Sequence, residues 1–317
     1  MTNLSYNLSP KLNNYLEKIE SLRKQILLSP INPRSEIKLR WDASVNRVFW
    51  SINLSGNPVG KPETVKLLSQ LGLRKLGKDQ KEILNYKKAL DFITENYLVS
   101  NTEIGFNTIK KIYETCFSGI ATNKGSLKAV QKEIDKILKY IQSGKDHPVI
   151  QAGIAQIEMI NLTSKTDGNG CLARLAPYLF LYKHGYDFRG MLVIDEFLRR
   201  DVVTLRSVIE NVAKTKNITL WLEYFAFGIA TQLTKALDNI QKQKISTEVP
   251  SSFWKLNDRQ KEVLRMMEQP GVRITNKNVQ KMFGISQITA SRDLTQMTSL
   301  GLIFSHGKGR SVYYTRV

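Results

Sequence analysis

Apolar residues recur at three- and four-residue steps along most of the chain, and this spacing predicts amphipathic helices. The first such run follows Ser9 and Pro10, a pair that favours helix initiation, and it stops near Pro30. Its apolar positions are Leu12, Tyr15, Leu16, Ile19, Leu22 and Ile26. The same period returns at 65–71 and 83–93, so the first hundred residues are predicted to be helical.

Helical periodicity also dominates the middle of the chain, with few strand signals. Its strongest segments are 109–116, 129–141, 149–162, 172–184 and 218–237. The run that follows, QKQKISTEVPSSFWK, combines Lys, Gln, Ser and one Pro without an apolar period, as linkers do. The chain is therefore predicted to have an amino-terminal helical region at 1–100, a helical core at 101–241, a linker at 242–255 and a carboxyl-terminal module at 256–317.

The pattern changes in the last 62 residues. An apolar period at 256–267 predicts one helix, Thr275 can cap a second, and Gly284 can end that second helix. Ser286 can cap a third helix, after which two apolar stretches flank the turn HGKGR at 306–310. The predicted buried face of the third helix is Ile288, Leu294, Met297 and Leu300. This order predicts a helix-turn-helix followed by a hairpin, within a mainly α fold.

Polar side chains on the third helix and in the hairpin turn suit DNA. Gln287, Ser291 and Arg292 are predicted to face outward, where they can reach base edges in the major groove. Lys308 and Arg310 lie in the hairpin turn and can contact phosphates. The module resembles the winged-helix domains of bacterial transcriptional regulators along nearly all of its length, which implies a DNA partner. The alternative is a docking or dimerising module with incidental charge.

Composition also favours a polyanionic partner. The 317-residue chain carries 47 Lys and Arg against 28 Asp and Glu, a net charge of +19. The carboxyl-terminal module has ten basic and four acidic residues, so its charge per residue is about twice that of the remaining chain. Hydrophobic residues make up 42%, enough to form buried cores. Nucleic acid is the expected partner, with an anionic membrane second.

The cysteines, the histidines and the first residues of the chain limit which kinds of protein this can be. Cys116 and Cys171 match no metal-ligand spacing and are too few for a disulfide scaffold, which suits a reducing cytosol. The three histidines are scattered, so a His-rich metal site is not expected. The start of the chain lacks signal-peptide features, and no apolar run approaches the ~18 residues of a membrane span. We expect a soluble, cytoplasmic protein with no membrane partner.

A glycine-rich loop, Asp167-Gly168-Asn169-Gly170, lies between two apolar helical segments. Backbone N–H groups at the start of the following helix, with glycines that let an anion approach, favour a phosphate site. The same residues are compatible with a tight interhelical turn in which Asn169 is left-handed. The loop residues alone leave both interpretations open.

The loop and its flanks resemble the signature of the Fic family, His-x-Phe-x-Asp/Glu-Gly-Asn-Gly-Arg-x-x-Arg. Members of this family usually transfer AMP from ATP to a hydroxyl of a target protein. The resemblance covers roughly residues 45–240 and includes the runs AGIAQIEMINL and WLEYFAFGIATQL. It implies a helical Fic core that binds ATP or ADP with Mg²⁺. The implied ligands are Asp167 for Mg²⁺, and Gly168, Asn169, Gly170 and Arg174 for the nucleotide phosphates.

Three positions depart from the family signature. Thr163 stands at the position of the catalytic His, Lys165 replaces the Phe, and Cys171 replaces the first Arg. In the family reaction the His takes a proton from the target hydroxyl, which a threonine hydroxyl cannot do near neutral pH. Loss of a general base typically lowers the rate ~10²–10⁴-fold. The chain is therefore predicted to be inactive in AMP transfer while it keeps nucleotide binding.

Two further family features are altered. The self-inhibitory helix of Fic proteins carries Ser/Thr-x-x-x-Glu-Gly/Asn, and the similar run at 51–57 has Ser55 in place of the Glu. No acid from this run would oppose Arg174. The segment at 119–126 is too short for the family's hairpin flap, which pairs with the target backbone. Both losses are consistent with a core without transferase activity.

These patterns lead to one preferred hypothesis and two alternatives. We predict a mainly helical DNA-binding regulator, in which an inactive Fic-like core is a nucleotide sensor or a platform for a protein partner. A homodimer is expected, because a single winged helix makes few base contacts. The first alternative is an active or altered transferase of nucleotidyl or phosphoryl groups, acting in protein AMPylation. The second is an interaction protein of the toxin–antitoxin kind, with no nucleotide, Mg²⁺ or other ligand in the loop.

Overall fold

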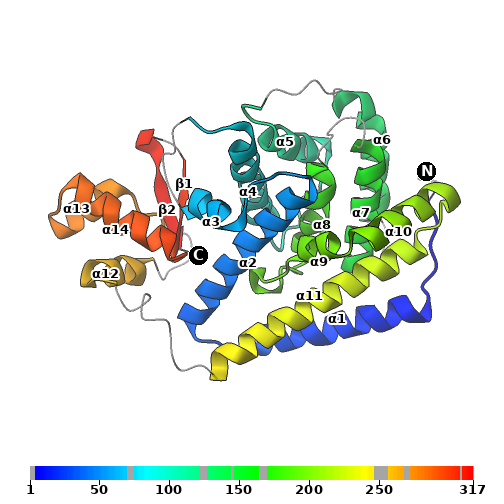
Figure 1. Ribbon diagram of the computed structural model, residues 1–317, viewed down its shortest axis with the longest axis horizontal. Coiled ribbons are helices and arrows are strands. Elements are labelled where there is room, and N and C mark those ends of the chain that lie inside the picture. The colour runs from blue at the N-terminus through cyan, green and yellow to red at the C-terminus, as the bar shows by residue number, and fades with distance from the viewer. Residues whose placement is uncertain are drawn as a thin grey trace.

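The computed structural model describes residues 4–69, 75–120, 127–143, 146–163, 170–245, 256–267, 272–307 and 309–316, without the side chains of 163, 243–245, 265 and 310. This part of the chain is mainly helical, as predicted (Figure 1). Its α-helices are α1 (Pro10–Leu28), α2 (Pro33–Leu54), α3 (Lys61–Ser69), α4 (Lys78–Tyr97), α5 (Phe106–Cys116), α6 (Gln131–Ser143), α7 (Pro148–Thr163), α8 (Cys171–Lys183), α9 (Ile194–Arg200), α10 (Val202–Thr215), α11 (Thr219–Ile245), α12 (Asp258–Met266), α13 (Asn276–Phe283) and α14 (Gln287–Ser299). Two strands, β1 (Ile303–His306) and β2 (Tyr313–Arg316), pair antiparallel. In these described ranges, no helix combines the length and the apolar character that crossing a membrane requires.

Helices α1 to α11 surround one hydrophobic core. Buried side chains from all eleven helices belong to a single cluster that extends from Leu12 in α1 to Ile240 in α11. The predicted boundary at residue 100 therefore falls inside one core. Helix α11 also continues to Ile245, into the predicted linker, because its Lys and Gln residues are good helix formers.

Helix α8 lies at the centre of this core. Every residue from Cys171 to Tyr182 is buried, as in a helix that is surrounded by protein. Helix α7 packs along α8, and Gly153 of α7 allows α11 to approach closely. The Trp221 Nε1 donates a 2.8 Å hydrogen bond to the Gly153 carbonyl, and a Cβ at Gly153 would lie 2.8 Å from Leu222 Cδ2. The glycine-rich loop thus connects two helices that are held by buried packing.

Helices α1 and α11 run side by side and in the same direction (Figure 1). Ser5 and Asn217 form a parallel bridge just before the two helices begin. Ser9 caps α1, accepting a 3.1 Å hydrogen bond from Leu12 N, and donates a 2.7 Å bond to Glu223 of α11. The predicted cap is confirmed, and the first helix is an integral part of the larger core.

The carboxyl-terminal helices α12 to α14 and the hairpin share a second hydrophobic cluster, which also includes Ile37 of α2. Thr275 caps α13 and Ser286 caps α14, as predicted. The two strands form the predicted hairpin, and Tyr314 of β2 also bridges to Ile274, just before α13. Helices and hairpin therefore form one packed unit.

The predicted buried face of α14 is wrong at one position. Ile288 is 66% exposed, and Ala290 is buried in its place. Ala290 begins a buried row that continues with Leu294 and Met297. Ile288 lies about 200° around the helix from Ala290, so this row leaves it on the outer face.

The hairpin packs against α2 and α4 of the larger core (Figure 1). The ring centres of Trp41 and Phe304 are 5.9 Å apart, and Lys87 Nζ lies 4.3 Å from the centre of the Phe304 ring. His306 Nδ1 is 3.3 Å from Glu95 Oε1. The carboxyl-terminal unit is therefore attached to the core through aromatic and cation–π contacts and through the close approach of His306 to Glu95.

A substitution at Gly301 tests this attachment. Gly301 has φ +68°, and a Cβ there would lie 2.4 Å from Trp41 Cγ. We expect Gly301→Ala to lower the free energy of unfolding by about 3 kcal/mol, because overpacking adds to backbone strain. Chemical denaturation measures this loss. Gly284→Ala is the matched control, with φ +62° and no atom within 4 Å, and should cost about 1 kcal/mol. Equal losses in the two variants would contradict the packing of Trp41 on Gly301.

Candidate functional site

Helix α8 presents Arg174, Tyr178 and Tyr182 on one face, at four-residue steps. Arg174 is 6% exposed, and its Nε donates a 2.6 Å hydrogen bond to Ser51 Oγ on α2. One turn earlier on α2, Arg47 Nη1 donates to the Tyr182 hydroxyl. These contacts join α2 to α8 and hold the Arg174 guanidinium beside the start of α8.

Asp195 of α9 adds a fully buried carboxylate to the same region. It accepts a 3.0 Å hydrogen bond from the Tyr178 hydroxyl. Burial raises the pKa of Asp195 to about 6, although the positive charge of Arg174 and the Tyr178 bond favour the ionised form. The Arg174 cluster, defined as Ser51, Arg174, Tyr178 and Asp195, thus places opposite charges near each other inside the protein.

Gly170 and Arg174 come together at the first turn of α8. Gly170 is the N-cap residue, with φ +66°, and a Cβ there would lie 2.9 Å from Arg174 Nη1. The guanidinium therefore lies over the helix start, where backbone N–H groups also favour an anion. The positive φ explains why glycine suits this position.

The other residues of the predicted nucleotide site lie outside the described part of the chain. These are Asp167, Gly168 and Asn169, together with the Thr163 side chain. Among the described residues, no three His, Cys, Asp or Glu side chains gather where they could hold a metal ion. The Mg²⁺ and nucleotide contacts of the loop therefore remain predictions.

Ser55, at the predicted inhibitory position, is the C-cap residue of α2. Its hydroxyl donates a 2.7 Å hydrogen bond to the Ile52 carbonyl, within its own helix. The residue of this run that holds Arg174 is Ser51, one turn earlier. The acid near Arg174 is Asp195, which the sequence reasoning missed. The sequence did contain a signal for Asp195. An acidic residue inside an apolar run is expected to be buried, and a buried carboxylate needs a partner.

Cys116 and Cys171 form a disulfide between the end of α5 and the start of α8, with a Cα–Cα distance of 6.8 Å. On sequence alone, the small number of cysteines indicates a reducing cytosol. Because the two cysteines pair with each other, their number no longer supports that inference. A spacing of 55 residues gave no reason to pair them, because only the packing of α5 beside α8 brings them together. Closing a loop of this length contributes about 4 kcal/mol in the chain-entropy model. Cys171, which the sequence predicts at the first Arg of the Fic signature, is thus a covalent anchor for α8.

The outer face of α14 is the second candidate site. Gln287, Ser291 and Arg292 are exposed on it, and the structure brings these three predicted residues together. Asn276 of α13 donates to Ser291 Oγ at 2.8 Å, which links α13 to this face. The exposed Ile288 adds an apolar group among them.

The acidic residue of α14, Asp293, points away from this face. It is 5% exposed and accepts hydrogen bonds from Arg259 Nε at 3.0 Å and from Gln260 Nε2 at 3.1 Å. Since α14 has no other Asp or Glu, its exposed face carries no carboxylate. Such a face can approach a polyanion without like-charge repulsion.

The two predicted phosphate contacts of the hairpin turn are not placed. Lys308 and the Arg310 side chain lie outside the described residues. The backbone of Arg310 belongs to a 3₁₀ turn, Gly309–Ser311, between the strands. The structure therefore places the backbone of Arg310 in the predicted turn, and the phosphate contact of its side chain stays a prediction.

The raised pKa of Asp195 makes stability depend on pH. The folded state binds this proton more tightly than the unfolded chain, so the contribution of Asp195 to the free energy of unfolding falls as pH rises from about 4 to about 6. A rise from 3.8 to about 6 corresponds to roughly 3 kcal/mol. Asp195→Asn removes this contribution, so the variant should gain stability relative to wild type across that window. Urea denaturation at several pH values measures the difference.

Asp238→Asn, which removes an exposed carboxyl of α11, is the control for the Asp195 experiment. Its stability difference from wild type gives the effect of losing one surface carboxyl. A pH-independent difference for Asp195→Asn would show that this carboxyl does not titrate in a buried environment.

Comparison with solved structures supports a Fic fold. No protein-family model and no curated protein sequence matches the chain. A Fic family protein from Desulfovibrio desulfuricans G20 aligns over 98% of this chain and 97% of its own, with 13% identity and a TM-score of 0.62. A Fic domain containing signaling protein from Bacteroides thetaiotaomicron VPI-5482 aligns over 75% of this chain and 100% of its own, with 16% identity and a TM-score of 0.53. Fic-1 from C. elegans aligns over 72% of each chain, with 16% identity and a TM-score of 0.60. At these identities the likeness establishes a Fic-like fold and leaves activity open.

Proposed function

We propose that this chain is a DNA-binding regulator whose Fic-like core does not transfer AMP. The observation that carries the proposal is the exposed face of α14, which is polar apart from Ile288, contains Arg292 and lacks a carboxylate. A regulator reads base edges through donors and acceptors on such a helix. The net charge of +19 favours approach to the phosphate backbone.

In this proposal, α12 to α14 and the hairpin act as a winged helix. Helix α14 is the recognition helix, with Gln287, Ser291 and Arg292 directed at base edges. Lys308 and Arg310, in the wing, contact phosphates and position the helix without reading sequence. The exposed Ile288 suits apolar contact with a thymine methyl group. Two copies are expected to bind together, because a homodimer doubles the base contacts.

The proposed loss of AMP transfer rests on Thr163. The Fic-like fold supports the alignment of this residue with the catalytic His of the family signature. An imidazole can accept a proton near neutral pH, whereas a threonine hydroxyl cannot. Cys171, in the disulfide, also supplies no guanidinium to a phosphate.

Nucleotide binding is the part of the Fic chemistry that we expect the core to keep. Arg174 supports this expectation, because its guanidinium lies at the start of α8, where a Cβ at Gly170 would be 2.9 Å from Nη1. Asp167 would hold Mg²⁺, and Gly168, Asn169, Gly170 and Arg174 would hold the phosphates of ATP or ADP. Bound Mg²⁺ would neutralise part of the negative charge on the phosphates.

Selection from genomic DNA fragments at ~0.15 M salt tests the DNA proposal. We expect the wild-type protein to enrich a defined sequence. Arg292→Ala should weaken binding to that sequence about 5- to 150-fold and change binding to unrelated DNA much less. Lys308→Ala should weaken binding to both DNAs, because phosphate contacts carry no sequence information.

Arg206→Ala is the matched control, since it removes an exposed arginine from α10. It should leave the selected sequence and its affinity unchanged. Absence of any enriched sequence, or equal effects of the Arg292 and Arg206 substitutions, would contradict the proposal.

A further inference from the structure

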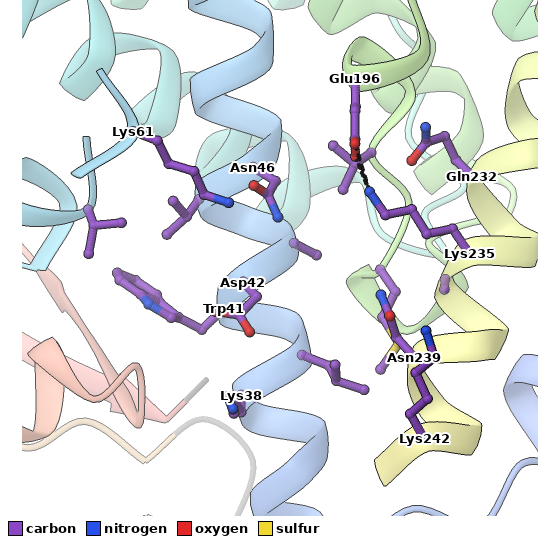
Figure 2. Close-up of a pocket in the computed structure, with 17 residues that line it drawn as sticks. Lys38, Trp41, Asp42, Asn46, Lys61, Glu196, Gln232, Lys235, Asn239 and Lys242 are labelled. Carbon is purple, nitrogen blue, oxygen red and sulfur yellow. Dashed lines mark hydrogen bonds and ion pairs between the residues drawn. The ribbon is translucent and has the colours of Figure 1, made fainter. Parts of the chain in front are cut away.

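A pocket of about 470 Å³ lies between α2, α3, α9 and α11 (Figure 2). None of its lining residues belongs to the Arg174 cluster or to the exposed face of α14. Its labelled charged and polar side chains are Lys38, Asp42, Asn46, Lys61, Glu196, Gln232, Lys235, Asn239 and Lys242. We call it the lysine pocket. Its volume lies in the range of sites that hold small organic ligands.

Positive charge exceeds negative charge in the lysine pocket. Four lysines line it, against two carboxylates. Lys235 Nζ lies 2.7 Å from both Glu196 carboxylate oxygens, and Arg200 Nη2 lies 2.8 Å from Oε1 of the same carboxylate. Glu196 is therefore already neutralised.

The other three lysines share a single remaining carboxylate, Asp42. Lys38 and Lys61 lie close enough to oppose the rise in the pKa of Asp42 that its partial desolvation causes. Within the described ranges, Lys38, Lys61 and Lys242 form no ion pair within 4.0 Å. Lys242 lines the pocket from α11, across from Asp42 on α2 (Figure 2). Three lysines against one carboxylate leave an excess of positive charge that a bound anion would balance.

The uncharged polar residues of the lysine pocket indicate which kind of anion it would bind. Asn46, Gln232 and Asn239 add carboxamides from α2 and α11, which donate and accept hydrogen bonds. Lysine ammonium groups bind phosphate as point charges. The combination suits a phosphate group attached to a small polar body.

We propose that the lysine pocket binds a small phosphate-bearing molecule, up to about the size of a mononucleotide. Its phosphate lies among Lys38, Lys61 and Lys242, and the carboxamides contact the polar body. The pocket is also lined by Trp41, the residue that packs against Phe304 of the hairpin. The ligand therefore contacts the helix to which the carboxyl-terminal unit is attached.

Calorimetric titration of the full chain with sodium pyrophosphate, at constant ionic strength, tests this site. We expect saturable binding to the wild-type protein. Lys61→Gln and Lys242→Gln should each weaken it about fivefold, and the double variant should weaken it more. Lys24→Gln, which removes an exposed lysine from α1, is the matched control and should bind as wild type does.

Pyrophosphate could instead bind at Gly170 and Arg174. The titration therefore measures the number of pyrophosphate molecules bound as well as their affinity, and the double lysine variant should bind one fewer than wild type. If the double lysine variant binds the same number with the same affinity as wild type, or if wild type binds no pyrophosphate at millimolar concentration, the proposal is wrong. The double variant is expected to fold, because both lysines are exposed. Failure of the DNA selection would leave this result unaffected, because the titration contains no DNA.

Discussion

The packing of α2 between its neighbours is the constraint on which the rest of the molecule depends. One face of α2 contacts α8 through Arg47 and Ser51, and a second face joins the carboxyl-terminal cluster through Ile37 and Trp41. A third face lines the lysine pocket. Because protein interiors are close-packed, α2 cannot move without disturbing its contacts with α8 and with the carboxyl-terminal unit. The Fic-like core and the carboxyl-terminal unit therefore share a helix.

Two arginines illustrate how the parts of the molecule differ. Arg174 is buried, bonded to Ser51, and placed near the Asp195 carboxylate, so its charge is balanced by the protein. Arg292 is exposed on α14, and the acid of its own helix is turned inward to Arg259. A balanced, buried charge stabilises one arrangement, whereas an exposed charge on a face without carboxylates attracts a polyanion. The buried charge of Arg174 thus joins α2 and α8, whereas the exposed charge of Arg292 suits the proposed contact of α14 with DNA.

Local features could be predicted from the sequence, but contacts across the fold could not. Helical periodicity and the caps at Ser9, Thr275 and Ser286 were predictable, because they depend on residues within one or two turns. The exposed polar face of α14 was also predictable, although Ile288 was assigned to the wrong side. Asp195, the disulfide of Cys171 and the lysine pocket each combine residues from distant segments, so they became visible only when the helices were packed.

The most direct measurement of the central claim is transfer of label from α-³²P-ATP, with Mg²⁺, to proteins of a cell lysate. With a hydroxyl at position 163 in place of an imidazole, we expect no covalent label above that of a heat-denatured sample. Labelling at an ordinary enzymatic rate, abolished by Asp167→Ala or Arg174→Ala, would contradict the claim and make the chain a transferase.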